Sequence, residues 1–116
     1  MVKEAVSRKT EAEEWLSELV SSWTDVYKKS MTTVVLLRII DNQGPVGVGV
    51  VAPEFTEQTG WVITERGLYR TLRRLANSGV LEATEESAAR TGAKRKIFRL
   101  TPLGKNYLTA VEARIL

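Results

Sequence analysis

Arg66, Arg70, Arg73 and Arg74 lie within nine residues of one another. A guanidinium group presents five N–H donors in a rigid fork that fits a phosphate or the O6 and N7 edge of guanine. At about 100° per residue, Arg66, Arg70, Arg73 and Asn77 fall on one face of a helix, with Arg74 beside it. The spacing therefore favours contact with a polyanion. A solubilising face, with arginines chosen for helix propensity, is the alternative interpretation.

Other chemistry has little support in the composition. The chain contains no cysteine and no histidine, which excludes disulfides, thiolate nucleophiles, zinc fingers and imidazole metal sites and removes the commonest general base. The acidic residues gather mostly on one expected helix, where a solvated face is the simplest explanation. Residues 47–52 match the glycine spacing of dinucleotide-binding loops, but Pro53 interrupts the long helix that such a loop requires. We therefore expect no enzyme activity, no metal and no cofactor.

The net charge of +3 over 116 residues conceals an asymmetry. Residues 64–105 hold ten basic residues and four glutamates, a net charge of +6, whereas residues 1–41 carry −1 and residues 42–63 carry −2. The positive field belongs to one third of the chain, the same third that holds the arginine cluster. The hydrophobic fraction of 43% is typical of one globular domain.

The helix that positions the arginines is predicted over residues 64–78. Thr64 is its expected N-cap and Gly79 its C-terminal stop. Leu68, Leu72 and Leu75 recur on the side opposite the arginines, so this helix has a leucine side and an arginine side.

Two helical patterns precede it. Residues 10–30 carry an amphipathic stripe, and residues 31–41 favour a second, buried helix over a strand. Near residues 28–30 the chain either bends or continues as one helix. Between residues 44 and 60 we expect a short strand, then a helix over 50–59 with Pro53 in its first turn and Gly60 as its cap.

Residues 80–85 and 96–101 predict two strands that pair as a hairpin around a loop at 86–95. Thr101 and Pro102 then begin a final amphipathic helix. The order predicts an α+β, mostly helical fold: a winged helix-turn-helix with an extra N-terminal helix and a C-terminal helix. The expected division is residues 1–30 for dimerisation or packing, 31–101 for the DNA-binding domain and 102–116 for the C-terminal helix.

Two segments resemble the PadR family of winged-helix transcriptional regulators. The first is the helix and turn at residues 67–82, with its Leu68-Tyr69 pair and Gly79-Val80-Leu81; the second is the strand and turn at residues 94–104. The resemblance implies a dimeric repressor that binds operator DNA and often releases it when a small molecule or a stress signal is sensed. It also implies, by analogy, that a flat aromatic effector could bind among the tryptophans.

We therefore expect a homodimer on double-stranded DNA, with residues 64–78 in the major groove and residues 86–95 as a wing on the adjacent backbone or minor groove. The arginines at 66, 70 and 73 are the candidates for reading bases. The expected DNA-binding residues are Thr64, Arg66, Tyr69, Arg70, Arg73, Arg74, Asn77, Arg90, Lys94 and Arg95. The expected dimer interface comprises Trp15, Leu19, Trp23, Val26, Tyr27, Leu108, Val111 and Ile115. Arg99 is set apart, because it can form an ion pair across the hairpin with Glu82 or Glu85.

Two other functions compete with this one. The winged helix could be a protein-protein interaction module without intrinsic DNA binding, although the charge asymmetry is then less well explained. RNA binding would call for aromatic side chains on the strands, and the predicted strands offer no such platform. The chain has no apolar stretch long enough for a membrane span and no uninterrupted hydrophobic segment near its N-terminus, so we expect a cytoplasmic location.

Overall fold

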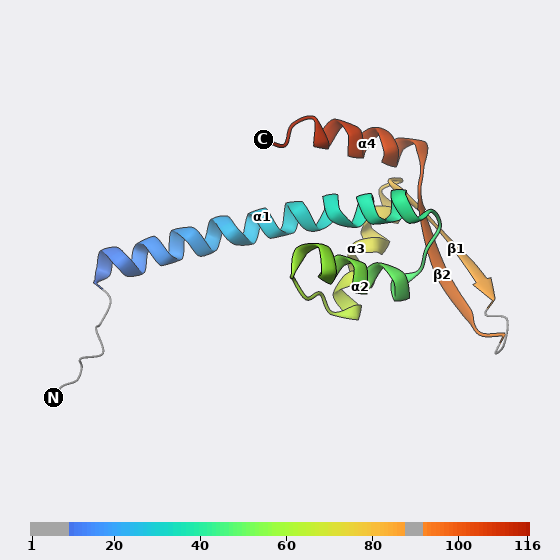
Figure 1. Cartoon of the computed structure of the whole chain (residues 1–116), viewed down its shortest axis with the longest axis horizontal. Coiled ribbons are helices and arrows are strands. Elements are labelled where there is room, and N and C mark those ends of the chain that lie inside the picture. The colour runs from blue at the N-terminus through green and yellow to red at the C-terminus, as the bar shows by residue number, and fades with distance from the viewer. Residues whose placement is uncertain (1–9, 88–91) are drawn as a thin grey trace. The chain divides into compact units, whose positions relative to one another are not determined.

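The computed structural model describes residues 10–87 and 92–116 and separates into two compact units, residues 1–31 and 32–116. The described residues form four helices and one antiparallel hairpin (Figure 1): α1 (Glu11–Gln43), α2 (Val48–Thr59), α3 (Glu65–Asn77), β1 (Leu81–Ser87), β2 (Lys94–Leu100) and α4 (Pro102–Glu112). This order confirms the expected α+β winged-helix fold. Within the described residues, no helix is both long and apolar enough to cross a bilayer.

Helix α1 begins at a reciprocal cap. Thr10 Oγ1 accepts a hydrogen bond from the Glu13 N–H at 3.1 Å, and Glu13 Oε1 accepts one from the Thr10 N–H at 2.8 Å. The helix runs unbroken through residues 28–30, so the two expected helices are one. Every residue from Val34 to Ile40 except Arg38 is buried, and this run is helical as favoured by the sequence.

The segment between α1 and α2 differs from the prediction. The expected strand is a single bridge, in which Val46 exchanges two backbone hydrogen bonds with Phe98, at 3.0 and 2.8 Å. Helix α2 begins at Val48, so Pro53 lies in its second turn and not in its first. A proline there removes a bond to the carbonyl of Gly49. Because Gly49 is exposed, water can satisfy that carbonyl and the helix continues.

The hairpin pairs β1 with β2 from Leu81 opposite Leu100 to Ser87 opposite Lys94. Figure 1 shows the two strands side by side. Both strands extend about two residues further toward the loop than the sequence predicts. Lys94 and Arg95, expected in the wing loop, therefore belong to β2.

The core of the second unit lies where α1, α2 and α3 meet. Its largest fully buried side chains, each below 2% exposed, are Phe55, Leu36, Leu37, Ile39, Ile40, Leu68, Leu72 and Val51. Helix α3 contributes its leucine side to this core, and the opposite side of the helix is left for solvent or a ligand.

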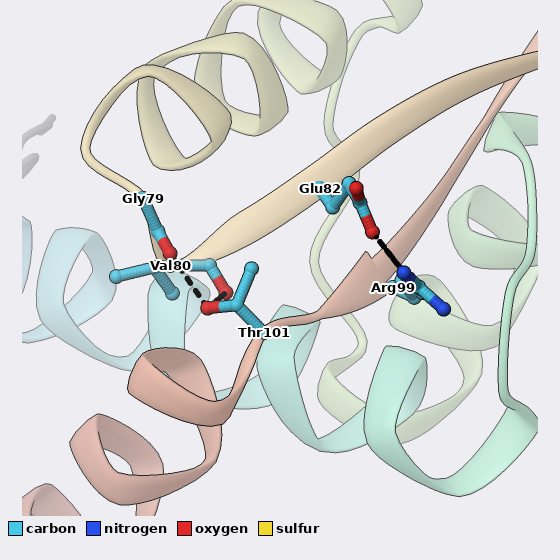
Figure 2. A network of polar contacts seen from close by, with 5 residues as sticks. All are labelled: Gly79, Val80, Glu82, Arg99 and Thr101. Atoms are coloured by element: carbon cyan, nitrogen blue, oxygen red, sulfur yellow. Dashed lines mark hydrogen bonds and ion pairs between the residues drawn. The ribbon is translucent and has the colours of Figure 1, made fainter.

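Thr101 joins the base of the hairpin to α4 (Figure 2). Its Oγ1 donates to the Gly79 carbonyl at 2.6 Å and accepts from the Gly104 N–H at 3.0 Å, which caps the helix. The apolar spacing placed Ile115 on the final helix. Helix α4 ends at Glu112, so Ile115 lies beyond it. Leu108 is only 6% exposed.

Candidate nucleic-acid interface

Helix α3 has well-defined ends. The Thr64 side chain accepts a hydrogen bond from the Gly67 N–H at 3.0 Å, and Gly79 adopts a positive φ of 88° just after the helix. Both signals were expected from the sequence and are confirmed. The buried leucines fix the rotation of the helix about its axis, and this rotation determines where the arginines point.

All four arginines of α3 point into solvent. Arg66, Arg70, Arg73 and Arg74 are exposed, and none forms an ion pair or hydrogen bond through its side chain with any residue that the structure describes. Glu65 is the single acidic residue of the helix. The positive charge of this arginine face (Arg66, Arg70, Arg73 and Arg74) is therefore available to an external anion.

Three polar residues accompany the arginine face. Asn77 and Thr64 are exposed, and Tyr69 has 36% of its surface exposed. The Thr64 hydroxyl is used as an acceptor by the helix cap, but its proton remains free to be donated. These side chains could therefore donate to phosphate oxygens beside the arginines.

The wing is less positive than its composition suggests, because the acidic residues of β1 lie opposite basic residues of β2. Arg95 pairs with Glu86 at 2.9 Å, and Arg99 pairs with Glu82 (Figure 2). Glu85 stands opposite Lys96 in the register. The pairing of Arg99 with Glu82 is one of the two alternatives that the sequence predicted.

The structure therefore describes two of the three cations that were expected in the wing, Lys94 and Arg95. Lys94 stands opposite Ser87, is exposed, and has no acidic partner among the described residues. Arg95 has 65% of its side chain exposed but shares its charge with Glu86. Arg90 lies outside the described residues. Of the expected wing cations, Lys94 is the one whose charge the strands leave uncompensated.

One exposed apolar residue shortly before α3 was missed. Val62, in the turn between α2 and α3, is 86% exposed, while Trp61 and Ile63 on either side are partly buried. It precedes the N-cap of α3 by two residues. The local signal was available, because an apolar residue between the helix stop at Gly60 and the cap at Thr64 has no helical stripe to join.

The residues expected at a dimer interface do not share one environment. Trp15, Leu19, Trp23, Val26 and Tyr27 are 43–65% exposed within the first unit, and Leu16 and Val20, which the prediction omitted, are exposed beside them. Trp23 and Tyr27 stack with ring centroids 5.2 Å apart. We call these seven residues the apolar stripe. Leu108, by contrast, is buried within its own chain and Val111 is partly buried, so Leu108 is not available to a second copy.

Comparisons with known proteins agree with this geometry. The model of the transcriptional regulator PadR-like family matches residues 36–110. A PadR family regulator from Eggerthella lenta superposes with a TM-score of 0.69 at 23% identity, covering 87% of this chain and 86% of that one. A PadR-like regulator from Bacillus cereus gives 0.64 at 22% identity, covering 74% and 82%.

A winged-helix DNA-binding protein from STIV gives a TM-score of 0.54 at 17% identity, covering 74% of this chain and 86% of that one. No curated protein matches the chain. At these identities the solved structures show a common fold alone. The family match is independent of them and spans more than half of the chain, from the buried end of α1 into α4. The chain therefore belongs to the PadR-like family of transcriptional regulators, which are not enzymes.

Proposed function

We propose that the protein is a repressor that binds double-stranded DNA as a homodimer, with α3 in the major groove. The observation that carries the proposal is the arginine face, four exposed guanidinium groups that pair with no described residue, on a helix whose other side is fixed in the core. A helix fits the major groove, where arginine can form two bonds to guanine while neighbouring cations hold phosphates.

Each candidate residue has a role in this arrangement. Arg66, Arg70 and Arg73 read bases, and Arg74 and Thr64 hold the backbone. Tyr69 and Asn77 contact phosphates or pack at the edge of the groove, and Val62 supplies an apolar contact at the N-terminal end of α3. Lys94, Arg95 and Arg90 form the wing contact, and Arg95 contributes least because Glu86 already pairs with it.

Salt dependence tests DNA binding. We expect log affinity to fall linearly with log salt concentration, with a slope of about −0.9 for each phosphate neutralised. A dimer that neutralises about six phosphates has a slope of about −5. Fluorescence anisotropy with a labelled duplex, titrated at several salt concentrations, measures this slope. A flat salt response would contradict the proposal, and a monomer without DNA affinity would favour the protein-protein interaction module.

The homodimer follows from the apolar stripe. An exposed helix that carries two tryptophans and a tyrosine on one face has a strong hydrophobic reason to be covered. A second copy supplies an identical stripe, and a two-fold dimer presents two α3 helices to two half-sites about one DNA turn apart, or ~34 Å. Repression then needs only occupancy of the operator. The family resemblance adds a small-molecule effector, for which quenching of tryptophan fluorescence by planar compounds is the test.

Trp23→Glu tests the dimer. We expect this variant to be monomeric at concentrations where the wild type is a dimer, because it places a charge on the stripe, and loss of a buried aromatic anchor costs about 2 kcal/mol or more. Light scattering after size-exclusion chromatography measures the mass. Ser21→Glu is the matched control, since it adds the same charge to the same helix on the side opposite the stripe. A monomeric wild type, or a dimeric Trp23→Glu variant, would contradict the assignment.

A further inference from the structure

We propose that the N-terminal segment of α1 pairs with the same segment of a second copy as an antiparallel two-helix coiled coil. In this arrangement Leu16 of one copy meets Val26 of the other, Leu19 meets Trp23, and the two-fold axis crosses the seam at the level of residue 21 along the helix. The inference rests on the proposed homodimer and adds the direction and register of its interface.

The seam comes from the spacing of four exposed apolar residues. Leu16, Leu19, Trp23 and Val26 follow one another at intervals of three, four and three residues, the alternation of the two core positions of a heptad. Their exposed fractions are 61, 49, 65 and 65%. Trp15 flanks the seam on one side, and Val20 and Tyr27 flank it on the other. The segment is therefore built to be covered by one further helix.

The direction follows from the distribution of charge along the segment. Its first two turns hold Glu11, Glu13, Glu14 and Glu18, whereas Lys28 and Lys29 lie at its other end. A parallel pair would bring the two acidic ends together, and like charges repel. An antiparallel pair brings each acidic end beside a basic end. On one flank, Lys29 of one copy then comes beside Trp15 of the other, between Glu11 and Glu18 of that copy.

We infer the register by comparing how many seam residues lie opposite apolar residues of the second copy in each possible alignment. With the axis at the level of residue 21, all four seam residues pair with one another. A shift of one heptad in one direction places Leu19 opposite Ser30 and Leu16 opposite Thr33. A shift in the other direction places Trp23 opposite Ala12. Each alternative leaves half of the seam against small or polar side chains, so the central register buries the most apolar surface.

Cysteine cross-linking tests direction and register, because the chain has no cysteine of its own. Leu16→Cys and Val26→Cys are prepared as separate full-length proteins and oxidised alone and after mixing. In the antiparallel pair, residue 16 of one copy lies about 15 Å along the axis from residue 16 of the other, too far for a disulfide. We expect a disulfide-linked dimer in the mixture and none in either variant alone.

Each other outcome overturns the inference. Cross-linking of either variant alone shows a parallel pair, and no cross-link in either experiment shows that residues 16 and 26 of two copies do not face each other. Light scattering of the variants and of the wild type separates the two levels of the proposal. Variants that are dimers but do not cross-link contradict only the register. A monomeric wild type contradicts the homodimer itself. Ser22→Cys is a second variant that leaves the seam intact. A short bismaleimide should link the two cysteines at position 22 of a dimer, since both Ser22 residues lie near the two-fold axis.

Discussion

Arg70→Ala is expected to weaken binding to a specific duplex by about 1–3 kcal/mol for each half-site. Since the proposed homodimer carries the change twice, the total loss is about 2–6 kcal/mol, on the order of thirtyfold or more in Kd. The physical reason is that Arg70 stands in the middle of the arginine face, exposed and without a carboxylate partner among the described residues. The measurement is anisotropy at fixed salt with the duplex that the wild type selects from a random pool.

Two further variants show what Arg70 contacts. Arg70→Lys keeps the charge but loses the two-donor fork, so it should remain weak and lose base preference if Arg70 reads a guanine. If Arg70 holds a phosphate, the lysine should restore most of the affinity. Arg114→Ala removes the same charge from the end of the chain, where the arginine bonds to the Ala110 carbonyl, and should leave binding unchanged. Unchanged binding in Arg70→Ala would remove this residue from the interface.

The parts of the fold that sequence reasoning predicted well are those governed by neighbours in the chain. The two ends of α3 depend on Thr64 and Gly79, each acting within a few residues, and the leucine spacing needs only the period of a helix. The arginine face followed directly, because once one side of a helix is buried the other side must be exposed. Local signals were therefore sufficient for the central element of the site.

The errors arose where distant contacts decide the structure. Val46 forms one bridge to Phe98 rather than a strand, and that pairing is set by tertiary packing across more than fifty residues. The extra length of β1 and β2 comes from the pairs Glu86–Arg95 and Ser87–Lys94, whose residue types have weak strand propensity but stand opposite one another once the register is fixed. The ion pairs Glu86–Arg95 and Glu82–Arg99 also offset part of the positive charge of the wing, which counting charges by segment could not reveal.

The residues predicted for a dimer interface also divide into those that local patterns identify and those that need the fold. The stripe from Trp15 to Tyr27 was recognised by its helical period, but periodicity cannot distinguish a face that packs within the chain from one that meets another chain. Leu108 lies on an equally regular apolar face, yet it is buried in its own subunit. Only the fold separates the two cases.

Gly104→Ala is expected to destabilise the second unit by about 3 kcal/mol. A Cβ at this position would lie 2.1 Å from the Val80 carbonyl oxygen and 3.1 Å from its carbonyl carbon, with a Leu100 side-chain carbon at 3.4 Å. The obstacle is backbone, so no side chain can turn aside to relieve it. Helix α4 would have to move by about 1 Å, which pulls on the Thr101 bonds to Gly79 and Val80 and on buried Leu108.

The destabilisation should exceed the gain of about 1 kcal/mol that alanine brings to a helix interior. Chemical denaturation at fixed protein concentration measures it, since dimerisation would couple stability to concentration. Gly49→Ala is the matched control: Gly49 lies in α2, and a Cβ there meets nothing within 4 Å. It should stabilise the protein by about 0.5–1 kcal/mol. The same chemical change is thus expected to act with opposite signs, and equal effects would show that α4 is not locked against the base of the hairpin.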